Sequence, residues 1–212
     1  MQAIAALTSE HRTVERLLSA LEGLVEESAV SGVDGRGGLG KLVGVLRRFI
    51  DELHHPKEVG ILLALLLETG LPAARGPTAA VLADHAAARR ALDRLQVLAC
   101  RPEPWNARGL ELLSRTAADL AVLLRGHMAQ EEALLFVLAD RAPEGMASRG
   151  EAMFVDHEAQ HAALASDLAH EVDALVARWA PRGAWPEQVP AGRAERGASR
   201  PDLASPQSLL LG

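Results

Sequence analysis

Histidine recurs on apolar helical stripes in four well-separated segments of this chain, and two of these histidines are followed four residues later by glutamate. Because residues four apart lie on one face of an α-helix, each His-x-x-x-Glu pair can present an imidazole and a carboxylate to the same point. Buried polar groups of this kind need partners, and a metal ion supplies them. The pattern predicts a metal site inside a helical bundle. The segments are EHRTVERLL, LHHPKEVGI, LADHAAARR and RGHMAQEEALLF.

Apolar residues recur at alternating three- and four-residue steps along most of the chain, which is typical of amphipathic helices that face a common core. The fourth of these stripes ends on Leu134 and Leu138. A fifth helical pattern spans about 144–177. The four main stripes cover 7–25, 39–65, 78–99 and 110–138.

These patterns predict an all-α protein, an up-down-up-down four-helix bundle with an additional C-terminal helix and a flexible tail. We expect the metal-binding bundle over 1–141 and a further helix over 142–180 that packs on the bundle or caps it. The last segment, 181–212, is rich in Pro, Gly, Ala, Arg and Ser without sustained periodicity. Such a composition predicts a disordered tail.

Composition and charge favour a helical protein and argue against nucleic-acid and membrane binding. Tyrosine is absent and other aromatic residues are scarce, which favours helix over sheet. A formal charge of −6 argues against a nucleic-acid or anionic-membrane surface. The most apolar run, 61–67, is far shorter than the roughly 20 residues that cross a bilayer.

The expected compartment is the cytoplasm. A single cysteine, Cys100, rules out an intrachain disulfide framework and suits a reducing environment. The first residues, MQAIAALTSEHR, lack the basic and long apolar regions of a signal peptide.

Six inward-facing side chains form the core of the predicted metal site. A lone histidine on an apolar stripe is more often a hydrogen-bonded core residue than a ligand, so the prediction depends on the combination. Two carboxylates and several imidazoles suit two iron or manganese ions, with the glutamates as bridges. A ferritin-like site would need Glu-x-x-His on two helices, a motif that Glu158/His161 fits, but the histidine-rich interpretation uses more of the observed residues. The six residues are His11, His54, Glu58, His85, His127 and Glu131.

Further histidines lie close to this set in sequence or spacing. His55 is rotated about 100° from His54 on a regular helix, although Pro56 can alter that rotation, so we include His55 as a possible ligand. His157 and His161 form an i,i+4 pair that could bind zinc or complete the site, but we interpret them as solvated or core-capping residues outside it.

The four histidine-bearing segments resemble the helices of the hemerythrin-like HHE cation-binding family, in order, over about 1–141. The combination of His, His-x-x-x-Glu, His and His-x-x-x-Glu carries the resemblance. It implies that the six residues named above occupy ligand positions and that Glu58 and Glu131 are bridging carboxylates. The quoted stretches are EHRTVERLLSALE, FIDELHHPKEVGILLALL, GPTAAVLADHAAARR and LRGHMAQEEALLFVLADRA.

The chain departs from oxygen-carrying hemerythrin on the third helix. That protein has a second histidine four residues from the first, whereas the neighbours of His85 at this spacing are Val81 and Arg89. One ligand is missing unless His55 or water replaces it, which argues against a simple dioxygen carrier.

Three functions follow as hypotheses. The first is a non-haem diiron protein that binds or senses a small ligand such as dioxygen, nitric oxide or peroxide, with two iron ions in preference to manganese or zinc. The second is an enzyme that acts on nitric oxide or peroxide, or a protein that delivers iron to damaged iron–sulfur proteins. The third is a metal-free structural bundle. The absence of tyrosine and of a redox cysteine pair favours binding over turnover, and the protein partner stays open.

Overall fold

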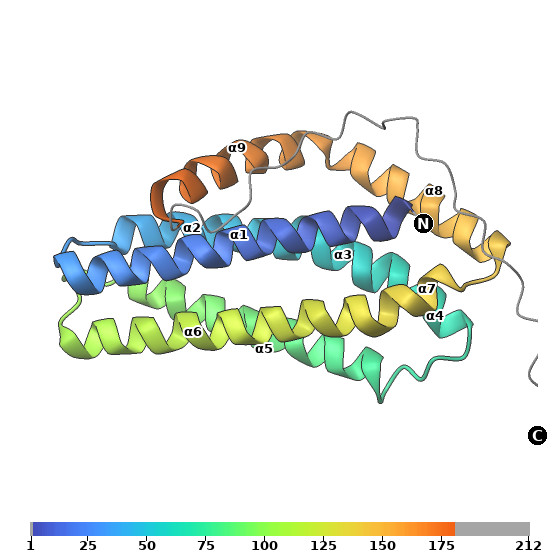
Figure 1. Ribbon diagram of the computed structural model, residues 1–212, viewed down its shortest axis with the longest axis horizontal. Helices are drawn as coiled ribbons and strands as arrows, with labels where there is room; N and C mark the ends of the chain where they lie inside the picture. Colours follow the sequence, from blue (N-terminus) through green and yellow to red (C-terminus); the bar gives the residue numbers. More distant parts are fainter. Residues whose placement is uncertain (1, 181–212) are drawn as a thin grey trace, which may run out of the picture.

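Four long helical rods run side by side in a computed structural model that describes residues 2–180 (Figure 1). No strand occurs within this range. The first rod is α1 (Gln2–Ser31) and the third is α5 (Pro77–Ala99). The second consists of α2 (Arg36–Arg48), η1 (Phe49–His54), α3 (His55–Lys57), η2 (Glu58–Leu63) and α4 (Ala64–Glu68). The fourth consists of α6 (Ala107–Gln130), η3 (Glu131–Leu135) and α7 (Phe136–Asp140).

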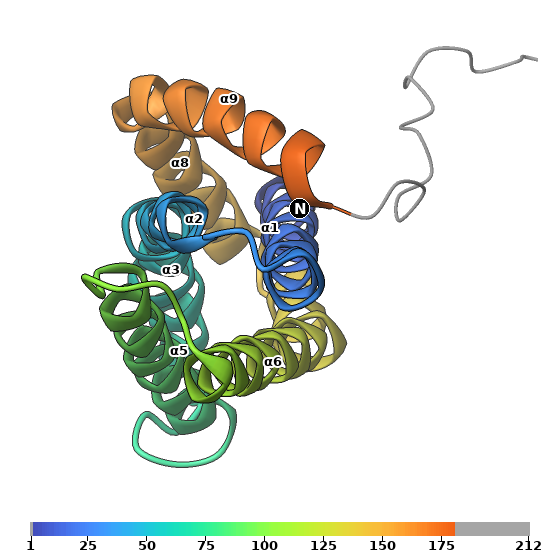
Figure 2. The same ribbon diagram turned by 90° about the vertical axis from the view of Figure 1, so that its left-hand side faces the viewer.

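The C-terminal part of the described chain lies against one side of this bundle. It forms α8 (Glu144–Gln160) and α9 (Ala162–Trp179), which contact α1 and the second rod (Figure 2). The all-α bundle with added C-terminal helix is therefore confirmed. The predicted tail, 181–212, lies outside the described residues. Within 2–180, no helix is long and apolar enough to cross a membrane.

The single helix expected over 144–177 is divided in two by a turn at His161. The His161 backbone, with φ −108° and ψ 11°, leaves the helical region, and its Nδ1–H donates a 2.8 Å hydrogen bond to the His157 carbonyl oxygen. Because the chain bends there, α9 can lie along α1 and bury Leu168, Val172 and Leu175. Because of this bend, α8 and α9 cover different parts of the bundle.

The buried stripes agree with the sequence patterns except at the end of the fourth rod. Leu134 is 39% exposed and Leu138 is only partly buried, whereas Leu135 and Ala139 are 1% and 5% exposed. The cause is η3, a wide π-helical turn that places one extra residue in the rod. An extra residue advances the core face by one position, so the expectation for Leu134 was wrong, whereas Leu138 still packs against the core at its edge.

Two more wide turns, η1 and η2, flank Pro56 in the second rod. The backbone N–H of His55 donates to the carbonyl oxygen of Ile50, five residues back. Proline has no N–H and clashes with the carbonyl four residues before it in a regular helix, so the wider turn accommodates it. The rod continues past Pro56 with its register altered.

Candidate metal centre

Two groups of buried side chains converge at the centre of the bundle, and each group holds its ligand atoms within 4.8 Å of one another. Together they contain every residue that the sequence predicted for the metal site, His55 included. The first group is His11, His54, Glu58 and Glu131, and the second is His55, Glu58, His85 and His127.

Glu58 belongs to both groups and lies between them. Its Oε1 atom is 2.8 Å from His54 Nε2, and its Oε2 atom is 3.1 Å from His85 Nε2. The side chain is fully buried, and neither oxygen has a hydrogen-bond partner of good geometry. One carboxylate with an oxygen directed at each group has the geometry of a bridge.

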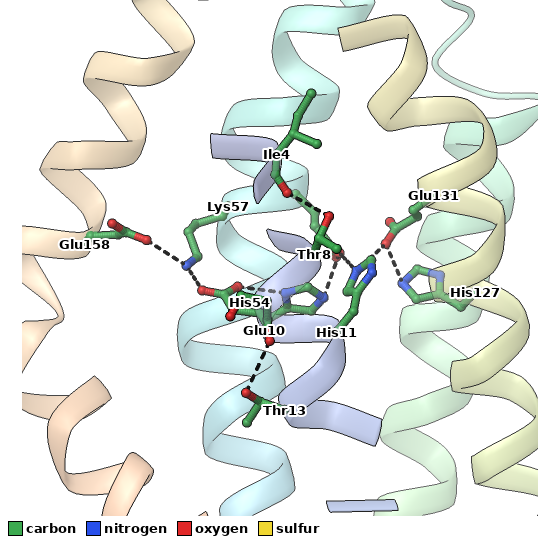
Figure 3. A network of polar contacts seen from close by, with 12 residues as sticks. Ile4, Thr8, Glu10, His11, Thr13, His54, Lys57, His127, Glu131 and Glu158 are labelled. Carbon is green, nitrogen blue, oxygen red and sulfur yellow. Dashed lines mark hydrogen bonds and ion pairs between the residues drawn. The ribbon is translucent and has the colours of Figure 1, made fainter. Parts of the chain in front are cut away.

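Glu131 also faces imidazoles from both groups. Its Oε2 atom is 3.3 Å from His11 Nε2 and 3.5 Å from His127 Nε2 (Figure 3). It comes from η3, immediately after α6, and is fully buried. The two glutamates thus approach the centre from the second and fourth rods.

The side chains of His54 and His55 both point toward the centre of the bundle in the structure. Its ring lies 3.4 Å from the His85 ring, centroid to centroid, with an angle of 13° between the planes. Both histidines are buried because the wide turn η1 and Pro56 change the rotation between neighbouring residues. The second group therefore has three imidazoles, and the first has two.

Unsatisfied polar atoms test whether a metal fits this pocket. Buried polar groups are nearly always hydrogen-bonded, and an unpaired one costs about 1–3 kcal/mol. Several such nitrogen and oxygen atoms face one another in this pocket. A cation bound among them would give each of them a partner. They are His11 Nε2, His54 Nε2, both Glu58 oxygens and both Glu131 oxygens.

Carboxylates outside the pocket accept hydrogen bonds from two of the imidazoles, His11 and His54, through Nδ1, the ring nitrogen that points away from the pocket. His11 Nδ1–H donates to Glu132 Oε1 at 2.8 Å, and His54 Nδ1–H donates to Glu10 Oε2 at 2.9 Å. An Nδ1–H bond of this kind fixes the tautomer and leaves Nε2 free to bind a metal. Our sequence reasoning missed Glu10 and Glu132, although each directly adjoins a predicted ligand.

Two aspartates lie near the Nδ1 atoms of His55 and His127, at longer distances. Asp51 is 3.6 Å from His55 Nδ1, and Asp84 is 3.6 Å from His127 Nδ1. Asp84 directly precedes His85 in the sequence, but it lies beside His127 of the neighbouring helix.

The buried side chain of Lys57 connects the outer carboxylate Glu10 to α8. The Lys57 ammonium group is ion-paired with Glu10 and lies 3.7 Å from Glu158, whose side chain is half exposed (Figure 3). It also lies 5.4 Å from the centre of the Phe154 ring. The chain of contacts runs from His54 through Glu10 and Lys57 to the surface, and the sequence patterns did not predict it.

His157 and His161 stack on each other, with ring centroids 4.1 Å apart. Neither belongs to the two groups of possible ligands found among residues 2–180. Their position on α8 and at the α8–α9 turn agrees with the interpretation that leaves them outside the site.

The two central glutamates differ in pKa. Burial alone would raise the pKa of Glu58, but the charge of His54 and the nearby imidazoles of His11 and His54 hold it well below its usual range. Burial raises the pKa of Glu131 to about 8. The metal-free pocket therefore favours the charged form of Glu58 and the protonated form of Glu131, and metal binding would favour loss of that proton.

An all-α bundle with paired His/Glu groups at its centre defines a class of metal-binding helical bundles. Comparison with protein families narrows this class, because the model of the hemerythrin HHE cation-binding domain matches residues 2–139. The chain belongs to that family. No curated protein and no solved structure matched the chain. The match ends before α8, so α8 and α9 lie outside the family domain.

Proposed function

We propose that this chain is a non-haem diiron protein that binds or senses a small ligand such as dioxygen, nitric oxide or peroxide. His11 and His54 would hold one iron and His55, His85 and His127 the other, and Glu58 and Glu131 would supply the carboxylates between them. The observation that carries this proposal is the position of Glu58, whose two oxygens face imidazoles of different groups at 2.8 and 3.1 Å.

The donor set favours iron. Imidazoles and carboxylates in these numbers suit iron, whereas structural zinc usually takes four ligands, often thiolates. When bound, iron with an open coordination position supplies a binding site for a small molecule and electrons to share with it. The chain holds the imidazoles in orientation through Glu10 and Glu132 and surrounds them with an aliphatic core.

The cytoplasm is the proposed compartment. The support is Cys100, the single cysteine, which is a free and exposed thiol in the structure. A free exposed thiol persists in reducing surroundings.

Anaerobic reconstitution with ferrous iron tests the function. We expect two irons per chain by metal analysis, a change in the optical spectrum on exposure to oxygen or nitric oxide, and recovery when the ligand is removed. His85→Ala should lower the iron content, whereas His170→Ala, on the exposed face of α9, should not. Ligand consumption with product release would instead indicate an enzyme. A chain that takes up no metal would be a structural bundle, which would refute the proposal.

A further inference from the structure

A pocket of about 140 Å³ lies between the start of α5 and the wide turn η3, and Glu131 lines it. Pro77, Ala80 and Val81 form the α5 side, and Leu134 and Leu135 form the η3 side. A single water needs roughly 10–15 Å³ of such space, so the pocket takes several molecules of that size.

The pocket leads inward from partly exposed to buried residues. Leu134 is 39% exposed, Pro77 and Ala80 are partly buried, and Val81 and Leu135 are 2% and 1% exposed. At its inner end is Glu131, whose fully buried oxygens have no hydrogen-bond partner. The Glu131 carboxylate lies 3.5 Å from His127 Nε2, so one residue of the pocket lining belongs to the candidate metal centre.

The wide turn η3 explains why this space is open. In an uninterrupted α-helix, the periodicity of the fourth rod directs Leu134 into the core, one turn after Glu131. The extra residue of η3 rotates Leu134 outward and moves Leu135 into the core. Leu134 then lies at the rim of the pocket, and the walls beside Glu131 are mainly apolar, with Gln130 as the exposed polar residue of the lining.

We propose that this pocket is the ligand entrance of the metal centre and admits uncharged molecules of two or three heavy atoms. The proposal rests on the proposed function for what lies behind the pocket. Apolar walls disfavour ions, which would lose hydration without new partners. The size suits a diatomic molecule or peroxide.

A second hollow, about 250 Å³, reaches the centre at His11. Its lining includes Glu15, Arg125 and Glu132, and the His11–Glu132 hydrogen bond occupies the nitrogen on that side. Arg125 is itself bound to Glu15 by several hydrogen bonds. Charged groups and an occupied nitrogen make this hollow a poorer path for an uncharged ligand.

Stopped-flow binding of nitric oxide to the diferrous protein tests the entrance. Ala80→Leu fills the pocket, and we expect association and dissociation rates to fall together by roughly tenfold, with the Kd and iron content unchanged. Leu134→Ala widens the rim and should raise both rates. The matched control is Ala83→Leu, on the exposed face of α5, which should leave both rates as they are. A change in Kd at constant association rate, or unchanged rates in Ala80→Leu, would overturn the proposal.

Xenon tests the same pocket without iron. In crystals of the metal-free full chain under xenon pressure, we expect xenon beside Val81 and Leu135 in the wild type and in Ala83→Leu, and none in Ala80→Leu. If the iron-loaded wild type binds no nitric oxide, the proposed function fails, and the xenon result then decides the pocket by itself. An empty pocket in the wild type would overturn the entrance.

Discussion

Glu58 is the residue on which both groups of the metal centre depend. Its oxygens face His54 and His85, which belong to different rods and different groups. Loss of a terminal ligand affects one ion, whereas loss of a bridge affects both. The outer carboxylates act differently, because they touch the imidazoles and not the metal.

Glu58→Ala should lower the metal content at both positions. The change removes the carboxylate that the two groups share, whose oxygens face His54 and His85. Metal analysis after reconstitution should give fewer than one iron per chain. Glu52→Ala, on the exposed face of the same rod, is the control and should retain the wild-type content. Loss of only one ion in Glu58→Ala would refute the bridging role.

Glu10→Ala should weaken metal binding without abolishing it. Glu10 accepts the Nδ1–H bond of His54, and loss of such an outer partner typically costs ten- to hundredfold in metal affinity. Titration against a competing chelator measures the effect. Glu10→Gln keeps an acceptor oxygen and should recover part of the affinity. Glu26→Ala, exposed on the same helix, should match the wild type, and an unchanged affinity in Glu10→Ala would contradict the orienting role.

At the scale of the elements, the three wide turns all lie at predicted ligands. η1 ends on His54, η2 begins with Glu58 and η3 begins with Glu131. Such turns occur mostly as single-turn insertions in α-helices, frequently at functional sites. Here they turn His55 inward and Leu134 outward. The second and fourth rods therefore depart from regular α-helix geometry beside the candidate metal centre and the proposed entrance.

Pro56→Ala should stabilise the metal-free chain and weaken its metal site. Alanine restores the N–H and a helix-favouring residue, so we expect a higher Tm without metal. The rod then approaches a regular α-helix, which rotates His55 away from His85 and lowers affinity in the second group. Calorimetry and metal titration measure the two effects. Pro72→Ala, in the loop after α4, should leave metal affinity unchanged, and the same result in Pro56→Ala would contradict this role.

At the scale of the whole molecule, α8 and α9 are attached to the bundle by polar and apolar contacts. The Ala3 backbone N–H, in the first turn of α1, lies 3.1 Å from Glu151 Oε2, and Lys57 reaches Glu158. Phe154 is 4% exposed and packs with the core residues around α1, η2 and η3. From these contacts we expect α8 to unfold together with the bundle.

Phe154→Ala should destabilise the entire protein. Truncation of a buried phenylalanine typically costs about 3–5 kcal/mol, and we expect one cooperative unfolding transition shifted to lower denaturant. Met153→Ala changes the neighbouring residue, which is 38% exposed, and should stay within about 0.5 kcal/mol of the wild type. A separate early transition in Phe154→Ala would indicate that α8 folds independently of the bundle.

Periodicity in the sequence was sufficient to predict the helical rods and the inward position of the six side chains proposed as ligands. His11, His54 and Glu58 lie on stripes whose apolar members must be buried, and residues three or four apart share a helix face wherever the helix is regular. Burial of the stripes brings their polar members together as well. The match to the family domain over 2–139 agrees with this prediction.

Only the tertiary structure decided the positions of His55, Leu134 and the outer residues Glu10 and Lys57. The wide turns break the helical period that the sequence pattern assumes, so one extra residue moves a side chain to a different face. Contacts such as Lys57 with Glu10 and Glu158 join separate helices, and their pairing depends on how the helices pack. A one-dimensional pattern carries the period within a helix, but the register between helices is set by packing in three dimensions.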